Sequence, residues 1–167
     1  CCGGGGPDPS FARWSLWMDE LIGFKSMVVW DKGPIGMGWH YRRSYELVLV
    51  AQKKGGKCRW YDTTDKIENI IRNIPKIIPS AKQHPTVKPE ALSAFFIRQH
   101  TQENDVVLDP FMGEGSTMRA ATKLHRRFIG MDISEEWCAK AAKKMLQGTL
   151  ELSTVSDNVV NQSALIE

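Results

Sequence analysis

The stretch VVLDPFMGEGST, at residues 106–117, decides the fold of this chain. Its apolar start, Val106–Asp109, predicts a β-strand. Gly113 and Gly115 predict a sharp turn, after which a helix is expected from about Ser116 to Leu124. Glycines leave the backbone open to a ligand, and the first N–H groups of a helix have no partner within it. The stretch therefore predicts a ligand-binding turn between a strand and a helix.

The residues on either side extend this pattern. A second strand is predicted at Arg127–Asp132 and a further helix at Ser134–Gln147, while a helix from Pro89 to about His100 precedes the first strand. Strands that alternate with helices are typical of a parallel α/β fold. Asp132 ends the second predicted strand, where a carboxylate can accept hydrogen bonds from both hydroxyls of a ribose. The pattern indicates an α/β nucleoside-binding fold.

Two classes of nucleoside cofactor share this arrangement. The nicotinamide fingerprint needs a third glycine, but Met118 stands at that position and opposes close packing of the helix on the strand. S-adenosylmethionine has no pyrophosphate and does not need that glycine. A tight turn that binds no ligand is the remaining alternative, because a pair of glycines is not specific by itself. The spacing favours S-adenosylmethionine over a nicotinamide cofactor.

The first half of the chain carries fewer signals. Apolar residues at helical spacing between positions 11 and 22, closed by Gly23, predict a short amphipathic helix. Strands are predicted at residues 27–30 and 45–51, joined by a glycine-containing loop at residues 33–38. Together they predict a long-looped antiparallel pair. Residues 55–83 show no periodicity, so a loop with at most one turn of helix is expected there.

Length and composition exclude several classes of protein. The 167 residues suffice for one domain, and no apolar run approaches the roughly 20 residues of a membrane span, so no membrane partner is expected. The first residues do not form a secretion signal, and we expect an intracellular, cytoplasmic protein. Four cysteines and four histidines lack the spacing of metal ligands, so no metal is expected. Residues 1–10 predict a disordered leader, and residues 149–167 a flexible tail.

The positive charge is concentrated in one segment. The chain carries a net +3, while eight basic and two acidic residues between positions 25 and 59 give that segment a net +6. Such a segment indicates a polyanionic partner, and the alternative is a solvated basic loop.

Three motifs carry a resemblance to a known family. They are HPTVKP at residues 84–89, DPFMGEGST at 109–117 and FIGMD at 128–132. In this order they resemble the β-type amino-group DNA methyltransferases, in which a catalytic half precedes the cofactor half. The resemblance extends over roughly residues 15–147, because residues 29–32 and 42–46 look like later parts of the catalytic half.

The resemblance implies a Rossmann-like S-adenosylmethionine-dependent methyltransferase fold that acts on adenine N6 or cytosine N4 in DNA. It leaves the choice between the two bases open. It divides a methyltransferase domain at residues 11–148 into the remainder of the catalytic half (11–54), a variable loop (55–83) and the cofactor half (84–148). S-adenosyl-L-methionine is the implied cofactor and DNA the implied partner.

The resemblance also implies roles for individual residues. Those expected at the cofactor are Thr86, Lys88, Asp109, Pro110, Phe111, Gly113, Gly115, Ser116, Thr117 and Asp132. Among them, Asp132 would bind the ribose, and Ser116 and Thr117 would cap the helix under the cofactor. Those expected at DNA phosphates are Lys53, Lys54, Lys57 and Arg59. Glu114 departs from the serine most often found between the two glycines, and we expect it to be exposed and to change only local polarity.

One motif of the family has no full match in these residues. The catalytic loop of Asp or Asn, Pro, Pro and an aromatic residue binds the target amino group and stacks on the flipped base. Its partial match is Asp8-Pro9-Ser10-Phe11, which lacks the second proline and a preceding apolar strand. Asp8, Pro9 and Phe11 are thus the catalytic candidates that the sequence offers.

The missing motif has consequences for the sheet and for activity. The strand before the catalytic loop is also missing, so we expect an incomplete sheet with an unpaired edge, in a fragment with weak or no activity alone. A homodimer or a complementing N-terminal part would complete it. The alternative is a non-catalytic remnant that binds cofactor and DNA.

Overall fold

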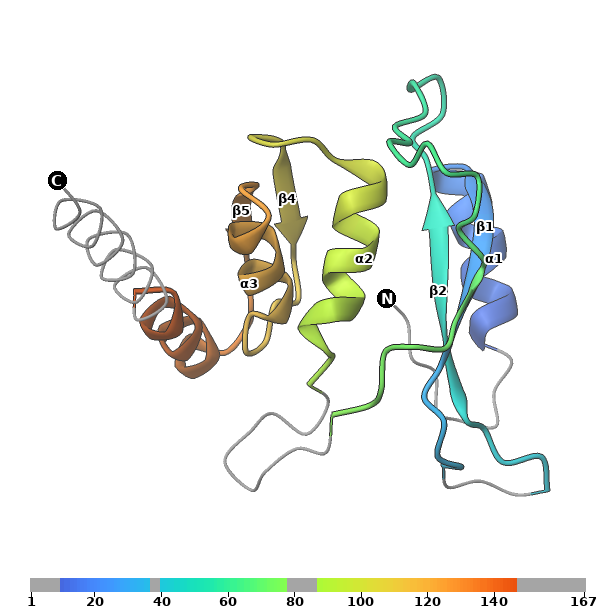
Figure 1. The fold of residues 1–167 in the computed structure, drawn as a ribbon, viewed down its shortest axis with the longest axis horizontal. Helices are drawn as coiled ribbons and strands as arrows, with labels where there is room; N and C mark the ends of the chain where they lie inside the picture. Colours follow the sequence, from blue (N-terminus) through green and yellow to red (C-terminus); the bar gives the residue numbers. More distant parts are fainter. Residues whose placement is uncertain (1–9, 37–39, 78–86, 147–167) are drawn as a thin grey trace, which may run out of the picture. The chain divides into compact units, whose positions relative to one another are not determined.

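The computed structural model describes residues 10–36, 40–77 and 87–146, and the chain divides into two compact units (Figure 1). The first unit takes in residues up to Ile78 together with Ala94–Gln102. The second takes in Pro79–Ser93 and the chain from Glu103 onward. Each unit has its own sheet, so each is described separately.

The first unit contains a three-stranded sheet with one helix against it. Helix α1 (Ser10–Leu21) precedes strands β1 (Phe24–Asp31), β2 (Tyr45–Ala51) and β3 (Ile70–Ile71), in the sheet order β2-β1-β3. The predicted antiparallel pair is confirmed, with Val28 opposite Val48. Gly23, at φ 119°, ends the helix as expected.

Strand β3 was not predicted from the sequence. It runs parallel to β1, with Val29 opposite Ile70 and Trp30 opposite Ile71. Two residues are too few to show a periodic pattern, so a strand of this length is invisible until its partner is known. The segment expected to be a loop therefore contributes an edge strand.

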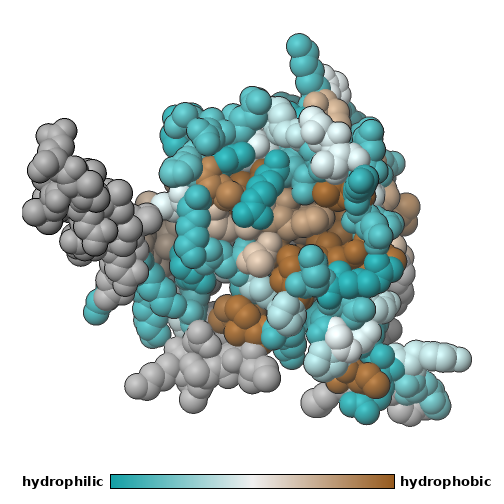
Figure 2. Space-filling model, in the orientation of Figure 1, coloured by the Kyte–Doolittle hydropathy of each residue, from teal (hydrophilic) through white to brown (hydrophobic). Residues whose placement is uncertain are grey.

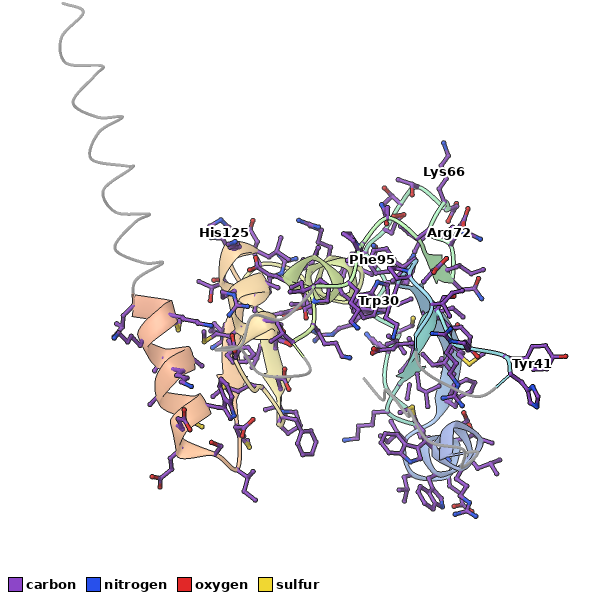
Figure 3. The ribbon with its side chains drawn as sticks, turned by 90° about the horizontal axis from the view of Figure 1, so that it is seen from below. Trp30, Tyr41, Lys66, Arg72, Phe95 and His125 are labelled. Atoms are coloured by element: carbon purple, nitrogen blue, oxygen red, sulfur yellow. The ribbon has the colours of Figure 1, made fainter. Side chains whose placement is uncertain are left out.

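Trp30 lies at the centre of the first unit. Its side chain, labelled in Figure 3, is 1% exposed, and its indole Nε1–H donates to the carbonyl oxygen of Ile74 at 2.7 Å. Ile71 and Ile74 are buried as well. A buried indole is stable only when its N–H finds an acceptor, so this bond fixes the segment after β3 against β1.

The second unit is the predicted parallel α/β unit. Helix α2 (Glu90–His100) begins in it, and strand β4 (Val106–Asp109), helix α3 (Ser116–Lys123) and strand β5 (Arg127–Gly130) follow. Residues 135–146 form a further helix. Strands β4 and β5 pair in parallel, with Leu108 opposite Ile129, which confirms the predicted topology.

Among the described residues of the second unit, helix α3 covers one face of the β4–β5 sheet and leaves the other face bare. Helix α3 buries Met118, Ala120 and Ala121. At alternate strand positions, Leu108 is 56% exposed, and Val106 and Ile129 are also exposed. Figure 2 shows hydrophobic residues among hydrophilic ones on the face of the molecule that it draws. Parallel sheets normally have both faces covered, so this sheet is incomplete, as predicted.

No helix among the described residues is both long and apolar enough to cross a membrane.

Candidate functional site

The end of β4 leads into a turn that is held by local hydrogen bonds. The Asp109 Oδ1 atom accepts the backbone N–H of Phe111 at 3.0 Å. Beyond β5, the N–H of Met131 donates to the Asp109 carbonyl and the N–H of Met112 donates to the Met131 carbonyl, both at 2.9 Å. The chain after β4 is thus fastened to the chain after β5. Pro110 and Phe111 project from this turn and are exposed.

The two glycines of the turn have different surroundings. Both adopt positive φ, 50° at Gly113 and 76° at Gly115, so the predicted need for glycine is confirmed. A Cβ added to Gly113 would meet no atom within 4 Å, whereas one added to Gly115 would lie 3.0 Å from the Met118 Cε atom. Gly113 therefore borders open space, while Gly115 allows the turn to pack closely on the helix below it.

Asp132 joins the second strand to the glycine turn. Its Oδ2 atom accepts the N–H of Gly113 and its Oδ1 atom accepts the N–H of Ser134, each at 2.9 Å. The structure therefore brings together Asp109, Gly113 and Asp132, which the sequence had placed at the ends of two strands. The strand itself ends at Gly130, two residues earlier than expected.

The prediction that Ser116 and Thr117 cap α3 is wrong. Gly115 takes the N-cap position in a left-handed conformation, and the cap has no side-chain hydrogen bond. Ser116 is the first helical residue, from which a side chain cannot reach the N–H groups that an N-cap residue satisfies. The Thr117 Oγ1 atom instead lies 3.4 Å from the hydroxyl of Ser93 in α2.

The prediction that Glu114 is exposed is also wrong. Glu114 is 6% exposed, and its Oε2 atom lies 2.6 Å from the Nζ atom of Lys144. Lys144 belongs to the helix at residues 135–146, which also contributes the fully buried Ala141 beside Gly115. The helix covers the turn and buries the side chain that the sequence had placed in solvent.

Sequence reasoning missed a group of charged residues around this turn. Arg119 donates from Nη1 to the Glu114 carbonyl at 2.8 Å, and its Nε atom lies 3.3 Å from the Glu90 carboxylate. Lys123 pairs with the same carboxylate at 2.9 Å. The spacing of Arg119 and Lys123 by four residues places both on one face of α3, which was the available signal.

The remaining predicted cofactor residues precede α2. Lys88 is described and half-buried, just before the helix begins. Thr86 lies outside the described residues. Their predicted contacts with the cofactor stay predictions.

The predicted DNA-binding residues belong to the first unit. Lys53, Lys54, Lys57 and Arg59 are all exposed. The Lys54 Nζ atom donates to the carbonyl of Glu20 at 2.8 Å, so this lysine also holds the end of α1. Their role in binding DNA stays a prediction.

The catalytic candidates lie at the start of the chain. Asp8 and Pro9 are outside the described residues, and Phe11 belongs to α1, which begins at Ser10. The family's catalytic loop follows a strand, whereas Ser10 and Phe11 lie in the first turn of α1.

Comparison with known proteins gives a consistent result. A family model described as DNA methylase matches residues 6–144. The chain is 34% identical over 148 residues to the type II methyltransferase M2.DpnII of Streptococcus pneumoniae, covering 79% of this chain and 55% of that protein. It is 26% identical over 157 residues to the DNA adenine methyltransferase YhdJ of Escherichia coli, covering 75% and 53%. The chain thus spans about half the length of these relatives.

Solved structures show the same likeness in three dimensions. The M1.HpyAVI–SAM complex superposes with a TM-score of 0.68 at 30% identity, covering 83% of this chain and 71% of that one. The cytosine-N4-specific PvuII DNA methyltransferase superposes with a TM-score of 0.67 at 20% identity, covering 83% and 58%. The predicted Rossmann-like methyltransferase fold is confirmed by these neighbours.

Proposed function

This chain belongs to the DNA methylase family, and we propose that it carries the cofactor half of an S-adenosylmethionine-dependent DNA methyltransferase. The reaction would move a methyl group to an exocyclic amino group, N6 of adenine or N4 of cytosine. The observation that carries the proposal is the hydrogen bond from Gly113 N–H to Asp132, because it joins the glycine turn to the expected ribose acceptor.

The residues at the turn fit an adenosine-containing cofactor. Open space at Gly113 lets a ligand approach the backbone, and the nearby Phe111 offers an exposed aromatic ring. A carboxylate can accept several hydrogen bonds, and the bonds from Gly113 and Ser134 hold the Asp132 carboxylate at the turn. Asp132 would accept a ribose hydroxyl in addition. When bound, the cofactor supplies a methyl group on a positively charged sulfonium.

A nicotinamide cofactor fits this turn less well. The buried Met118 fills the space below Gly115 where the dinucleotide fingerprint requires a third glycine. We therefore favour the methyltransferase over an oxidoreductase.

Methyl transfer also needs groups that hold the target base. The exocyclic amino group is a weak nucleophile because its lone pair is delocalised into the ring, so it must be hydrogen-bonded and aimed at the sulfonium. The family's Asp or Asn, Pro, Pro, aromatic loop does this, and residues 1–167 contain only the partial match at Asp8-Pro9-Ser10-Phe11. We expect this chain alone to bind cofactor and to transfer methyl groups slowly or not at all.

A complementing N-terminal part that carries the catalytic loop would restore transfer. Two exposed apolar surfaces support such a partner, because it could cover them. One is the bare face of the β4–β5 sheet around Leu108, and the other is the part of α1 that exposes Trp14 and Trp17. The relatives, of which this chain spans about half, are long enough to contain it. A homodimer that covers the same surfaces is the competing arrangement.

The basic segment is the proposed DNA contact. Lys53, Lys57 and Arg59 are exposed, and Tyr41 extends away from the β1–β2 connection beside two arginines (Figure 3). Lysine and arginine neutralise phosphates, and an exposed ring can stack on an unpaired base.

Calorimetry with S-adenosylhomocysteine tests the cofactor site. Asp132→Ala should weaken binding by about 1–3 kcal/mol, because the ribose loses charge-assisted hydrogen bonds. Glu135→Ala, which removes an exposed acid three residues away, should bind as the wild type does. Because Asp132 also holds Gly113, adenosine and adenine are titrated in parallel: a loss seen for adenosine and not for adenine, which has no ribose, places the effect at the ribose. Absence of binding by the wild type would refute the proposal.

A labelled-methyl assay on DNA tests the need for a partner. The chain alone is compared with the chain mixed with a polypeptide that carries the Asp or Asn, Pro, Pro, aromatic motif and its strand. We expect transfer only in the mixture. If the chain alone transferred methyl groups at rates typical of enzymes, the need for a partner would be contradicted. If the chain bound cofactor and DNA but no methyl transfer occurred with or without the partner, a non-catalytic remnant of the family would be favoured. Sedimentation of the chain alone distinguishes a homodimer.

A further inference from the structure

Glu114 is the buried charged side chain of the structure. Among the described residues it is the one polar or charged side chain classed with the buried core, at 6% exposed. It lies between Gly113 and Gly115, whose positive φ angles make the turn. A buried carboxylate is costly unless a cation or hydrogen-bond donor compensates it, so its partner must matter for the turn.

Lys144 supplies that compensation from a separate element. Its Nζ atom is 2.6 Å from the Glu114 Oε2 atom, across 30 residues of sequence. The two side chains are unequally exposed, 40% for the lysine and 5% for the glutamate. The ammonium group thus reaches from a half-exposed position to a carboxylate that water hardly reaches, which makes the pair less screened than a surface pair.

The pair acts on a turn that contains two glycines. The glycines on either side of Glu114 have more backbone freedom than any other residue type would have at these positions. Glu114 is held through both its side chain and its backbone, because its carbonyl oxygen also accepts a hydrogen bond from Arg119 Nη1 at 2.8 Å. The side-chain bond to Lys144 therefore ties the residue between the two glycines to the helix at residues 135–146.

We propose that Glu114 and Lys144 are positioning residues that hold the Gly113–Gly115 turn in the shape that binds the cofactor. The inference rests on the proposed function and adds to it a pair of residues that need not touch the cofactor. A serine, the residue most often found in the family at this position, could not reach a lysine in the same way. The longer side chain of Glu114 does reach Lys144, whose ammonium group balances its charge.

The same helix provides a matched control. Lys143 is the neighbouring lysine and is exposed, so Lys143→Met removes the same charge from the same helix without touching the turn. A second pair on this helix, Glu136 with Lys140, is an exposed pair four residues apart. Surface pairs of that kind contribute little, so an effect confined to Lys144 separates the buried pair from the charge of the helix as a whole.

The first test measures affinity for S-adenosylhomocysteine by calorimetry in the full chain. Lys144→Met should weaken binding about tenfold or more, because it removes the ammonium group that pairs with the buried carboxylate. Lys144→Arg keeps the charge and should restore binding to within about threefold, and Lys143→Met should match the wild type. The double variant Glu114→Gln with Lys144→Met should be no weaker than Lys144→Met alone, because the two changes remove one interaction.

The second test needs no ligand. Hydrogen exchange of the Gly113 and Gly115 amides, which donate to Asp132 and Met112, reports whether the turn is held. Lys144→Met should exchange both amides about tenfold faster, and Lys143→Met should leave them unchanged. If circular dichroism shows that Lys144→Met does not fold, Glu114→Gln replaces it as the variant that lacks the ion pair. Lys144→Arg then remains the variant that keeps the charge.

The outcomes distinguish this inference from the proposed function. If the wild type does not bind S-adenosylhomocysteine, the proposed function fails, and the exchange measurement alone judges the positioning role. If the wild type binds and Lys144→Met binds equally well with unchanged exchange, the positioning role is refuted while the cofactor site stands. Equal losses in Lys144→Met and Lys143→Met would refute it as well.

Discussion

Replacing each glycine of the turn by alanine should separate backbone strain from ligand contact. An L-residue held in the left-handed region costs roughly 1–2 kcal/mol. At Gly113 an added methyl group meets no atom within 4 Å, so Gly113→Ala should lower the free energy of unfolding by that strain alone. At Gly115 the methyl group would lie 3.0 Å from Met118 Cε and 3.4 Å from Ala141 Cβ, which adds about 1–3 kcal/mol of overpacking.

The effects on ligand binding should run in the opposite order to the effects on stability. Open space at Gly113 is where the cofactor would approach the backbone, so Gly113→Ala should weaken S-adenosylhomocysteine binding by more than about tenfold, or about 1.4 kcal/mol. Gly115→Ala should lose more stability and affect affinity mainly through the shape of the turn. Urea unfolding and calorimetry on the same samples measure both quantities.

Gly55 provides the control for strain. It has φ 74°, lies in the loop after β2, and has no atom within 4 Å of an added Cβ. Gly55→Ala should therefore lose about the same 1–2 kcal/mol as Gly113→Ala and keep wild-type affinity. If Gly113→Ala also kept wild-type affinity, the space beside Gly113 would not be the cofactor's position, and the site would have to be sought elsewhere.

Four further substitutions test other parts of the molecule. Trp30→Phe leaves the Ile74 carbonyl without its buried donor and should lower the free energy of unfolding by about 1–3 kcal/mol, measured by urea titration. Lys53→Gln and Lys57→Gln should each lower the slope of log affinity for duplex DNA against log salt by about 1, and an unchanged slope would remove that lysine from the DNA contact. Leu108→Gln should change the stability of the chain alone by no more than about 0.5 kcal/mol because its side chain is exposed, yet it should weaken capture of a complementing N-terminal part in a pull-down.

The part of the fold that could be predicted is the part whose signals lie close together in the sequence. Gly113 and Gly115 marked the turn because no other residue adopts positive φ without strain, and the apolar runs on either side marked β4 and α3. Asp132 was placed correctly at the glycine turn because parallel strands end at the same edge of a sheet.

The features that were missed depend on residues distant in the sequence. Glu114 is buried where it pairs with Lys144 of the helix at residues 135–146. The sequence of the turn itself does not indicate that this helix packs on it. Ile70 and Ile71 form strand β3 because they pair with β1. Two residues alone show no strand pattern, so the strand could not be predicted from them. The capping prediction failed for a subtler reason: the helix begins one residue after a glycine that takes the N-cap position itself.

The short reach of the hydrogen bonds at the glycine turn has a consequence for the order of folding. Its bonds join residues 2 and 19 positions apart, and its ion pair residues 30 apart. In the first unit, the bonds of Lys54 to Glu20, His100 to Arg59 and Trp30 to Ile74 span 34, 41 and 44 positions. Contacts between near neighbours in the chain lose less entropy on closing and form sooner. We therefore expect the hydrogen bonds within the glycine turn to form before the bond that joins Trp30 to Ile74.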